Sequence, residues 1–185
     1  MSAVTATVRP ARPADAEAVA RIYVETWRSA YPGILPDQVL IGMSQDRQEA
    51  TWRAILSERG GQSAFVAECG AAGVVGFATA GPARVGPAGY RGEVYTLYVL
   101  EDHQGRGLGR RLLSASLAAL HARRLGPALV WVLGANPARF FYEAMGGRPL
   151  AQRTARMGGA EHEELAYGWA DLARAVAPDG PCPEP

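Results

Sequence analysis

Three glycines at alternate positions, Gly105, Gly107 and Gly109, stand between an apolar run at 94–100 and a stretch of helical periodicity at 110–124. A chain with this order leaves a strand, turns tightly and enters a helix, because glycine adopts turn conformations that other residues avoid. The first amides of such a helix direct free N–H groups and the positive end of the helix dipole toward the turn. The sequence therefore predicts an α/β fold with an anion-binding site at this junction.

Arginines surround the predicted turn. Arg106, Arg110 and Arg111 add fixed positive charge, and a guanidinium fork matches phosphate oxygens better than a point ammonium does. The ligand predicted from these residues is a phosphate group, and a pyrophosphate suits the length of the turn. The alternative is a plain strand-to-helix connection in which the glycines only ease a tight turn.

Two other glycine-rich phosphate loops do not fit the spacing. The dinucleotide-binding fingerprint would need its third glycine where the chain has Arg110. The Walker A loop ends in Gly-Lys-Ser/Thr, whereas this loop ends in Gly109-Arg110-Arg111 and the chain contains no lysine. Dinucleotide-dependent redox chemistry and ATP hydrolysis are therefore excluded as predictions.

The remaining pattern, with Gln104, Gly107 and Gly109, resembles the Gln/Arg-x-x-Gly-x-Gly/Ala signature of the GNAT superfamily of acyl-CoA-dependent N-acyltransferases. The resemblance implies that acetyl-CoA or coenzyme A binds as a co-substrate and that no metal takes part. It assigns cofactor binding to the turn and to positions on the flanking elements. These residues are Leu97, Tyr98, Val99, Gln104, Gly105, Arg106, Gly107, Leu108, Gly109, Arg110, Asn136 and Phe140.

Composition limits the classes of partner. The chain has 185 residues and a net charge of +1, so one domain is expected and no global field attracts nucleic acid or an anionic membrane. Cys69 and Cys182 form neither a disulfide framework nor a metal set, which favours the reducing cytoplasm. No apolar run reaches membrane-spanning length, and residues 1–13 lack the core of a secretory signal.

Local patterns predict the order β-α-α-β-β-β-α-β-α-β-β. The second helical region is expected to break near 42–44, and Gly81 to Gly92 is expected to be a loop. The expected strands are 5–9, 63–69, 74–80, 93–100, 128–133, 148–157 and 163–171. The first helix is expected to begin near Asp15, and the second helical region to contain Val39 and Trp52. The third helix should follow the glycine turn, and the fourth should follow Asn136-Pro137.

The same order characterises the GNAT fold, so the resemblance runs from about Val4 to Trp169. It implies a mixed sheet whose central strands, here 93–100 and 128–133, splay apart. We expect a single domain over 1–173 and a Pro-rich, disordered tail over 174–185.

In GNAT enzymes the pantetheine arm of the cofactor lies in the splay. Peptide groups left unpaired there need partners, and an amide-bearing pantetheine can act as a surrogate strand. The resemblance gives this role to Leu97, Tyr98 and Val99, one of whose amides would also hold the thioester oxygen as charge develops on it. Their side chains are expected to be ordinary core.

Tyr142 is the predicted general acid. It lies in a segment, Asn136 to Tyr142, that resembles the family's Asn…Phe-Tyr motif, whose tyrosine donates to the coenzyme sulfur. A phenol protonates a thiolate only through a close hydrogen bond in the transition state, because its usual pKa, about 10, exceeds that of a thiol. The alternative is an amphipathic packing residue.

Glu93 is the predicted base, since it is the acid within the strand that leads to the glycine turn and family members often carry a glutamate nearby. Two alternatives stay open at this point. The carboxylate could bind the ammonium of the substrate electrostatically, or it could be a solvated residue at the strand end.

Acceptor recognition is assigned by resemblance to the first two helices and the last hairpin. The predicted residues are Glu25, Trp27, Tyr31 and Tyr95, of which Trp27 and Tyr31 share one helical face. Glu25 and Glu93 favour a cationic acceptor, either a small amine or an amine of a protein or peptide. Direct attack in a ternary complex is expected, because no cysteine or serine is placed as a nucleophile. A non-catalytic acyl-CoA sensor, a longer acyl group and a homodimer are left open.

Overall fold

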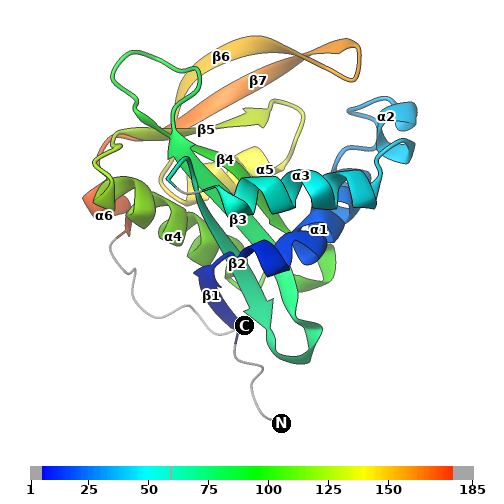
Figure 1. The fold of residues 1–185 in the computed structure, drawn as a ribbon. Coiled ribbons are helices and arrows are strands. Elements are labelled where there is room, and N and C mark those ends of the chain that lie inside the picture. Colours follow the sequence, from blue (N-terminus) through cyan, green and yellow to red (C-terminus); the bar gives the residue numbers. More distant parts are fainter. Residues whose placement is uncertain (1–5, 59, 177–185) are drawn as a thin grey trace.

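The computed structural model describes residues 6–58 and 60–176, which form one seven-stranded mixed sheet with helices on both faces (Figure 1). The strand order is β1-β2-β3-β4-β5-β7-β6, and every neighbouring pair is antiparallel except β4 and β5. The strands are β1 (Ala6–Pro10), β2 (Ser63–Cys69), β3 (Val74–Pro82), β4 (Gly92–Val99), β5 (Ala128–Leu133), β6 (Arg148–Met157) and β7 (Ala160–Trp169).

The helices follow the predicted order, with one addition at the C-terminal end. They are α1 (Ala16–Ala30), α2 (Asp37–Ile41), α3 (Gln45–Ser57), α4 (Leu108–Ala122), α5 (Ala138–Ala144) and α6 (Leu172–Val176). Short 3-10 turns occur at η1 (Pro13–Asp15), η2 (Gly70–Ala72) and η3 (Glu101–His103). No helix within the described stretches is long and apolar enough to cross a membrane.

Each face of the sheet has its own helical cover. On one face, α1 and α3 pack on β2 and β3 through a buried cluster that includes Ile22, Trp52 and Phe77. On the other face, α4 packs on β2 to β4, and α5 and α6 complete a cluster with β5 and β7. The predicted apolar face of α4 is confirmed, because its leucines are at most 2% exposed; they are Leu108, Leu112, Leu113, Leu117 and Leu120.

The predicted break in the second helical region is confirmed. α2 ends at Ile41, and α3 starts after Ser44, whose Oγ accepts a hydrogen bond from Arg47 N at 3.4 Å. A serine in this position satisfies one of the amides that a helix start leaves without a partner. The break turns the chain so that α2 and α3 become separate helices.

Several predicted boundaries are wrong. The loop predicted over Gly81 to Gly92 is shorter, because β3 continues to Pro82 and β4 begins at Gly92, where the two residues pair. β7 begins at Ala160 rather than Glu163, since Gly158 and Gly159, both with positive φ, make a tight two-residue turn. Thr5, the first residue of the predicted N-terminal strand, and Cys182 lie outside the described residues.

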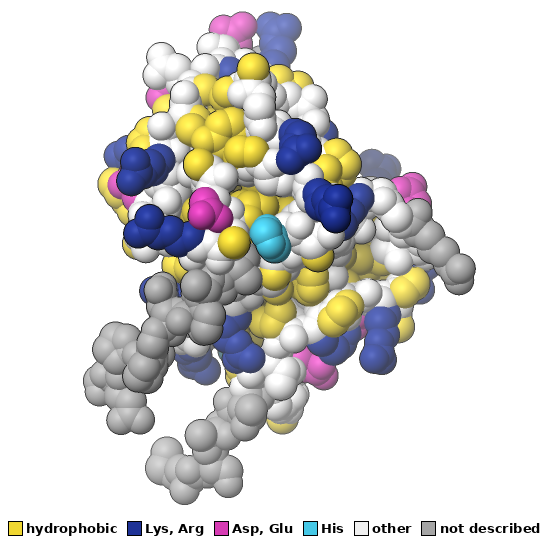
Figure 2. Space-filling model, turned by 90° about the vertical axis from the view of Figure 1, so that its left-hand side faces the viewer, with side chains coloured by type: hydrophobic (Ala, Val, Ile, Leu, Met, Phe, Trp, Pro, Cys, Tyr) yellow, Lys and Arg dark blue, Asp and Glu magenta, His cyan; other side chains and the backbone are white. Residues whose placement is uncertain are grey.

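The helix α6 was not anticipated. Leu172 is 3% exposed and joins the core cluster of α4, and Ala175 packs against the same cluster, so the described chain stays packed past the predicted domain boundary at 173–174. Figure 2 views the side of the molecule where α4 and α6 lie. The dark-blue side chains there are all arginines, because the chain has no lysine, and they are spread around apolar surface rather than gathered in one block. The end of the domain at residue 173 stays a prediction.

The start of α1 is fixed by a partly buried ion pair that makes a testable contribution to stability. Arg9 donates to both carboxylate oxygens of Asp15 at 2.9 Å, and Arg12 N donates to the same carboxylate at 2.7 Å. The hydrogen bonds from Arg9, ahead of all other causes, lower the pKa of Asp15 below its ordinary value. A carboxyl whose pKa is lower in the folded state stabilises the fold above its unfolded pKa, and that contribution is lost as pH falls through the folded pKa.

We therefore expect Asp15→Asn to reduce the free energy of unfolding by about 1 kcal/mol near neutral pH. The difference from the wild type should shrink as pH falls below about 4, where the Asp15 carboxyl of the unfolded chain begins to take up a proton, and should vanish below the lower pKa of the folded state. Urea unfolding at several pH values measures this. Glu68→Gln, which removes a more exposed partner of Arg9, is the control and should have the smaller effect. A pH-independent loss in Asp15→Asn would contradict the electrostatic origin.

Candidate functional site

Strands β4 and β5 separate part-way along the sheet. They share three paired positions, the last of which joins Val94 to Val130. Past these residues β4 continues to pair with β3, and β5 with β7, so the facing edges of the two strands have no strand partner in the described chain. The predicted splay is thus confirmed, and it creates the opening around which the other candidate residues are arranged.

The backbone groups that face the opening can be assigned. Leu100 N donates to a β3 carbonyl at 2.9 Å. Because peptide groups alternate in direction along a strand, those of Tyr98 also turn toward β3, and those of Leu97 and Val99 turn toward β5. In agreement, Gln104 Nε2 donates to Val99 O at 2.9 Å. Of the three residues predicted to offer backbone contacts, Leu97 and Val99 therefore have the suitable orientation.

A bulge in β4 sets which side chains share a face. The register shifts between Thr79–Thr96 and Ala80–Val94, so Tyr95 is the extra residue. Val94 and Leu97 consequently both pack toward α4 although they are three residues apart. The bulge was not predicted, because no local sequence signal distinguishes it from regular strand.

The glycine turn has the geometry of an open cradle. Gly105 and Gly107 have φ values of +72° and +73°, and a Cβ on either would meet nothing within 4 Å. Gly107 precedes the first residue of α4 and no side chain caps the helix there, so the amides of Leu108 and Gly109 lack intrahelical acceptors. Arg106 is exposed beside the turn. This arrangement fits a pyrophosphate, as the sequence predicts.

Tyr142 enters the site from α5. Asn136 Oδ1 accepts a hydrogen bond from Ala138 N at 2.9 Å and so fixes the start of this helix, one residue later than predicted. Tyr142 is 6% exposed and packs edge-on against Phe141 and Trp169. Burial raises the pKa of the Tyr142 phenol above its ordinary value, and the charge that Tyr31 would carry raises it further. The phenol is therefore held in its protonated, donor form.

Tyr31 approaches the same opening from the end of α1. Its ring lies 5.1 Å from that of Trp27, whose Nε1 donates to Tyr98 Oη at 3.1 Å. Burial raises the pKa of Tyr31, while hydrogen bonding with Tyr98 and Asn136 lowers it. The structure thus brings together five predicted site residues, called here the tyrosine cluster: Trp27, Tyr31, Tyr98, Asn136 and Tyr142.

Glu93 lies in the paired part of β4, away from the tyrosine cluster, and already has a partner. Its side chain is buried, and Oε2 accepts from Arg84 N at 2.8 Å. Oε1 accepts from Arg84 Nη2 at 2.6 Å and from Nε at 3.2 Å. The same guanidinium stacks over the Tyr95 ring at 4.3 Å. Arg84 therefore neutralises and covers the predicted base.

Three predicted residues lie outside this grouping. Glu25 is exposed on another face of α1, where it pairs with Arg21 at 3.4 Å. Tyr95 Oη donates to Pro82 O at 2.6 Å, beside the Glu93 end of β4. Phe140 is 55% exposed on α5, with the Arg139 guanidinium 4.2 Å over its ring. The structure places these side chains without testing their predicted roles.

Two buried or paired residues near the site were missed. Arg84 belongs to the segment predicted as featureless loop; the signal that could have indicated it is that an acid inside a strand needs a cation nearby. Glu164, on β7, is 9% exposed and pairs with Arg153 at 2.7 Å. Its negative charge contributes to raising the pKa of Tyr31. Its position opposite Leu133 depends on the β5–β7 register, which local patterns do not reveal.

The last hairpin reaches the region of α2. A Cβ on Gly158, in the β6–β7 turn, would lie 2.8 Å from Val39 and 3.1 Å from Pro36. Met157 packs in the same apolar cluster as Tyr31 and Leu40. The two regions assigned to acceptor recognition are therefore in contact. Within residues 6–58 and 60–176, no group of three or more His, Cys, Asp or Glu side chains is arranged to hold a metal ion.

Comparisons with known proteins agree with this geometry. Residues 60–146 match the family model of the acetyltransferase (GNAT) domain. The chain is 34% identical over 167 residues to the uncharacterized N-acetyltransferase YuaI of Bacillus subtilis, covering 90% of this chain and 94% of the relative. The yncA acetyltransferase of Salmonella typhimurium, solved with its cofactor acetyl-CoA, superposes with a TM-score of 0.63 at 27% identity, over 95% of this chain and 98% of that one. A ribosomal-protein-alanine N-acetyltransferase from Brucella melitensis shares the fold, with a TM-score of 0.68 at 22% identity. The match covers 89% of this chain and 99% of that one.

Proposed function

We propose that this chain, which belongs to the GNAT family of acetyltransferases, moves the acetyl group of acetyl-CoA to a primary amine by direct attack in a ternary complex. The observation that carries the proposal is the opening between β4 and β5, with the glycine turn beside one strand and Tyr142 beside the other. The acetyltransferase family and the glycine cradle both favour this reaction.

The residues available fit coenzyme A. The turn at Gly105 and Gly107 would take the pyrophosphate on the first amides of α4, with Arg106 adding charge. The peptide groups of Leu97 and Val99 would bond the amides of the pantetheine arm. Gln104, whose amide is engaged by Val99 O, would hold the turn against the strand. Acetyl-CoA supplies an activated acyl group as a thioester.

The chain's own residues would then divide the chemistry among them. A backbone N–H at Leu97 or Val99 would stabilise the negative charge that develops on the thioester oxygen. Tyr142 would donate a hydrogen bond to the departing sulfur, because burial keeps its phenol protonated and the phenol lies near enough to Tyr31 for the two groups to interact electrostatically. The acceptor amine would approach from the side of Trp27 and Tyr31, where the β6–β7 turn closes over α2.

Glu93 has two proposed roles, base or anchor for the acceptor ammonium, and both require Arg84 to move. With three donors from Arg84, the carboxylate has little capacity left to take a proton or a second cation. The proposal therefore includes displacement of the Arg84 side chain, which is 65% exposed and belongs to a residue outside regular strand. A cationic acceptor would compete with the guanidinium for the same carboxylate.

We expect Glu93→Gln to lower kcat about tenfold and to shift the acidic limb of the pH–rate profile if Glu93 is the base. A raised KM for the amine with unchanged kcat would instead identify it as the anchor. Arg84→Gln is the matched variant: it frees the carboxylate and should keep kcat while lowering the KM for a cationic amine. If both variants change only the melting temperature, the pair is structural and neither role holds.

A thiol-release assay with acetyl-CoA over a panel of primary amines tests the proposed reaction. The panel should contain small aliphatic amines, amino sugars, and peptides with a free N-terminus or a lysine. We expect amine-dependent release of coenzyme A with at least one acceptor, and formation of the N-acetyl product by mass spectrometry. Binding of coenzyme A without release on any amine would contradict the proposal. Cytoplasmic location and a homodimer stay predictions.

A further inference from the structure

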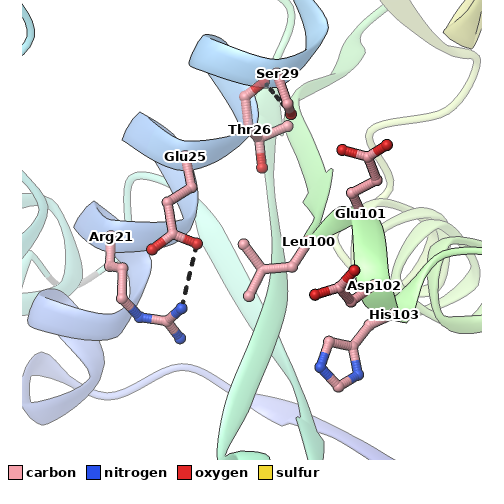
Figure 3. A pocket seen from close by; sticks show the side chains of 8 residues that line it. All are labelled: Arg21, Glu25, Thr26, Ser29, Leu100, Glu101, Asp102 and His103. Atoms are coloured by element: carbon pink, nitrogen blue, oxygen red, sulfur yellow. Dashed lines mark hydrogen bonds and ion pairs between the residues drawn. The ribbon is translucent and has the colours of Figure 1, made fainter.

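A small pocket lies between α1 and the η3 turn, at the end of β4. It has a volume of about 330 Å³, and Figure 3 shows the eight side chains that line it. This volume is at the lower end of the range for small-molecule sites, about 300–1,000 Å³. Glu25, which the sequence assigns to acceptor recognition, lines this pocket, but none of the lining residues belongs to the tyrosine cluster, where the acceptor is proposed to approach.

The charge of the pocket is negative. Glu25 enters from α1, and Glu101 and Asp102 enter from η3 on the opposite side. Arg21 is the one arginine in the lining, and it is engaged by Glu25 at 3.4 Å and by Val74 O at 3.0 Å. Two carboxylates therefore have no cation from the lining, which favours a positively charged ligand.

Two polar atoms at the pocket are buried without a hydrogen-bond partner. Thr26 is 8% exposed, and its Oγ1 has no partner, nor does His103 Nδ1. Figure 3 shows the Thr26 side chain directed into the space between α1 and Leu100. Ser29 Oγ donates to the Thr26 carbonyl at 3.2 Å, so the backbone of Thr26 is satisfied while its hydroxyl is not. A ligand that carries N–H donors would satisfy these atoms.

We infer that this pocket binds an aliphatic diamine, and that the bound diamine strengthens the binding of coenzyme A at the neighbouring turn. A primary ammonium offers three donors and no acceptor, which matches a hydroxyl and carboxylates. Carboxylates on both walls suit a chain with an ammonium at each end. A metal ion does not fit, since the acids of the described chain are not grouped as a metal site requires.

The link to coenzyme A follows from the chain path and rests on the proposed function. His103 N donates to Leu100 O at 2.9 Å and Gln104 N donates to Glu101 O at 3.0 Å, so η3 is continuous with the glycine turn. The carboxylates of Glu101 and Asp102 repel a pyrophosphate placed at that turn. A bound cation neutralises them, and by linkage coenzyme A in turn strengthens binding of the diamine.

The test begins with calorimetric titration of 1,4-diaminobutane into the CoA-free protein at fixed ionic strength. Thr26→Val removes the hydroxyl at nearly constant shape, and because that hydroxyl has no partner the fold should be retained. We expect binding to the wild type and at least about fivefold weaker binding to Thr26→Val and to Glu101→Gln. Glu17→Gln, an equal change of charge on α1 outside the pocket, is the matched control and should bind as the wild type does.

The second arm measures coenzyme A affinity with and without the diamine. We expect the diamine to tighten it about fivefold in the wild type and to have no effect in Thr26→Val. The proposed site would be overturned if the diamine did not bind, or if it bound Thr26→Val as tightly as the wild type. Displacement of the bound diamine by Mg²⁺ at the same ionic strength would also overturn it. Unchanged coenzyme A affinity would overturn the link. Failure of the proposed function is distinguishable, because the amine panel would then give no release of coenzyme A, whereas both titrations measure binding and keep their meaning without turnover.

Discussion

Gly107→Asp will lower the affinity for coenzyme A at least about a hundredfold, whereas Gly107→Asn will retain most of it. The two side chains have nearly the same shape and are the ones best tolerated at positive φ, here +73°. They differ in charge. Like charges about 4 Å apart at an effective dielectric constant of about 20 repel by about 4 kcal/mol, and a hundredfold loss needs only about 2.8 kcal/mol. Calorimetric titration with coenzyme A measures both affinities.

Melting temperatures provide the control for this pair. A Cβ at position 107 meets nothing within 4 Å, so both variants carry only the backbone strain of a left-handed residue and should melt at similar temperatures. Equal affinity of the two variants for coenzyme A would show that no phosphate lies against the turn. The cradle would then be an ordinary strand-to-helix connection.

The parts of the fold that could be predicted are those governed by local pattern. The leucine face of α4 and the glycine turn are encoded within a few residues, because burial of one helical face and positive φ values each demand particular residue types. Similarly, Trp27 and Tyr31 could be placed on one face from their spacing. The resemblance to a known family added the splay, which no local pattern shows.

The parts that could not be predicted depend on contacts between distant segments. Arg84 lies in a Gly- and Pro-rich stretch without periodicity, and only the folded β3–β4 connection brings it to Glu93. The sequence suggested that Glu25 and Glu93 serve one site for a cationic acceptor. The packing of α1 instead directs Glu25 to Arg21, whereas Glu93 pairs with Arg84 elsewhere in the fold. Likewise, α6 has a single fully buried leucine, too little for a periodic signal.

Tyr142→Phe is expected to lower kcat about a hundredfold with ordinary coenzyme A affinity and an ordinary melting temperature. The substitution removes one hydroxyl and keeps the ring, whose edge-on contact with Trp169 of β7 holds α5 against the sheet. Protonation of the departing thiolate is lost, and general acid catalysis contributes about 10²- to 10⁴-fold. Steady-state kinetics with an acceptor found in the amine panel measures the change.

The pH dependence of this variant follows from the direction of the Tyr142 pKa shift. Burial raises that pKa above its ordinary value of 10.0, so the phenol stays protonated, and able to donate, throughout the neutral and mildly alkaline range. Tyr142 therefore contributes no alkaline limb there. Profiles of log kcat against pH for the wild type and Tyr142→Phe should be parallel, and an alkaline limb that disappears in the variant would show that Tyr142 ionises in this range instead.

Dependence on the leaving group separates an acid from a residue that only positions the thioester. Transfer from a phenol to a thiolate is uphill by at least about one pKa unit, so the hydroxyl matters most when the sulfur is most basic. With an acetyl donor whose thiol is more acidic, the defect of Tyr142→Phe should shrink toward the wild-type rate. A defect of the same size with every donor would assign Tyr142 to positioning, and near-full turnover would leave it as a packing residue between α5 and β7.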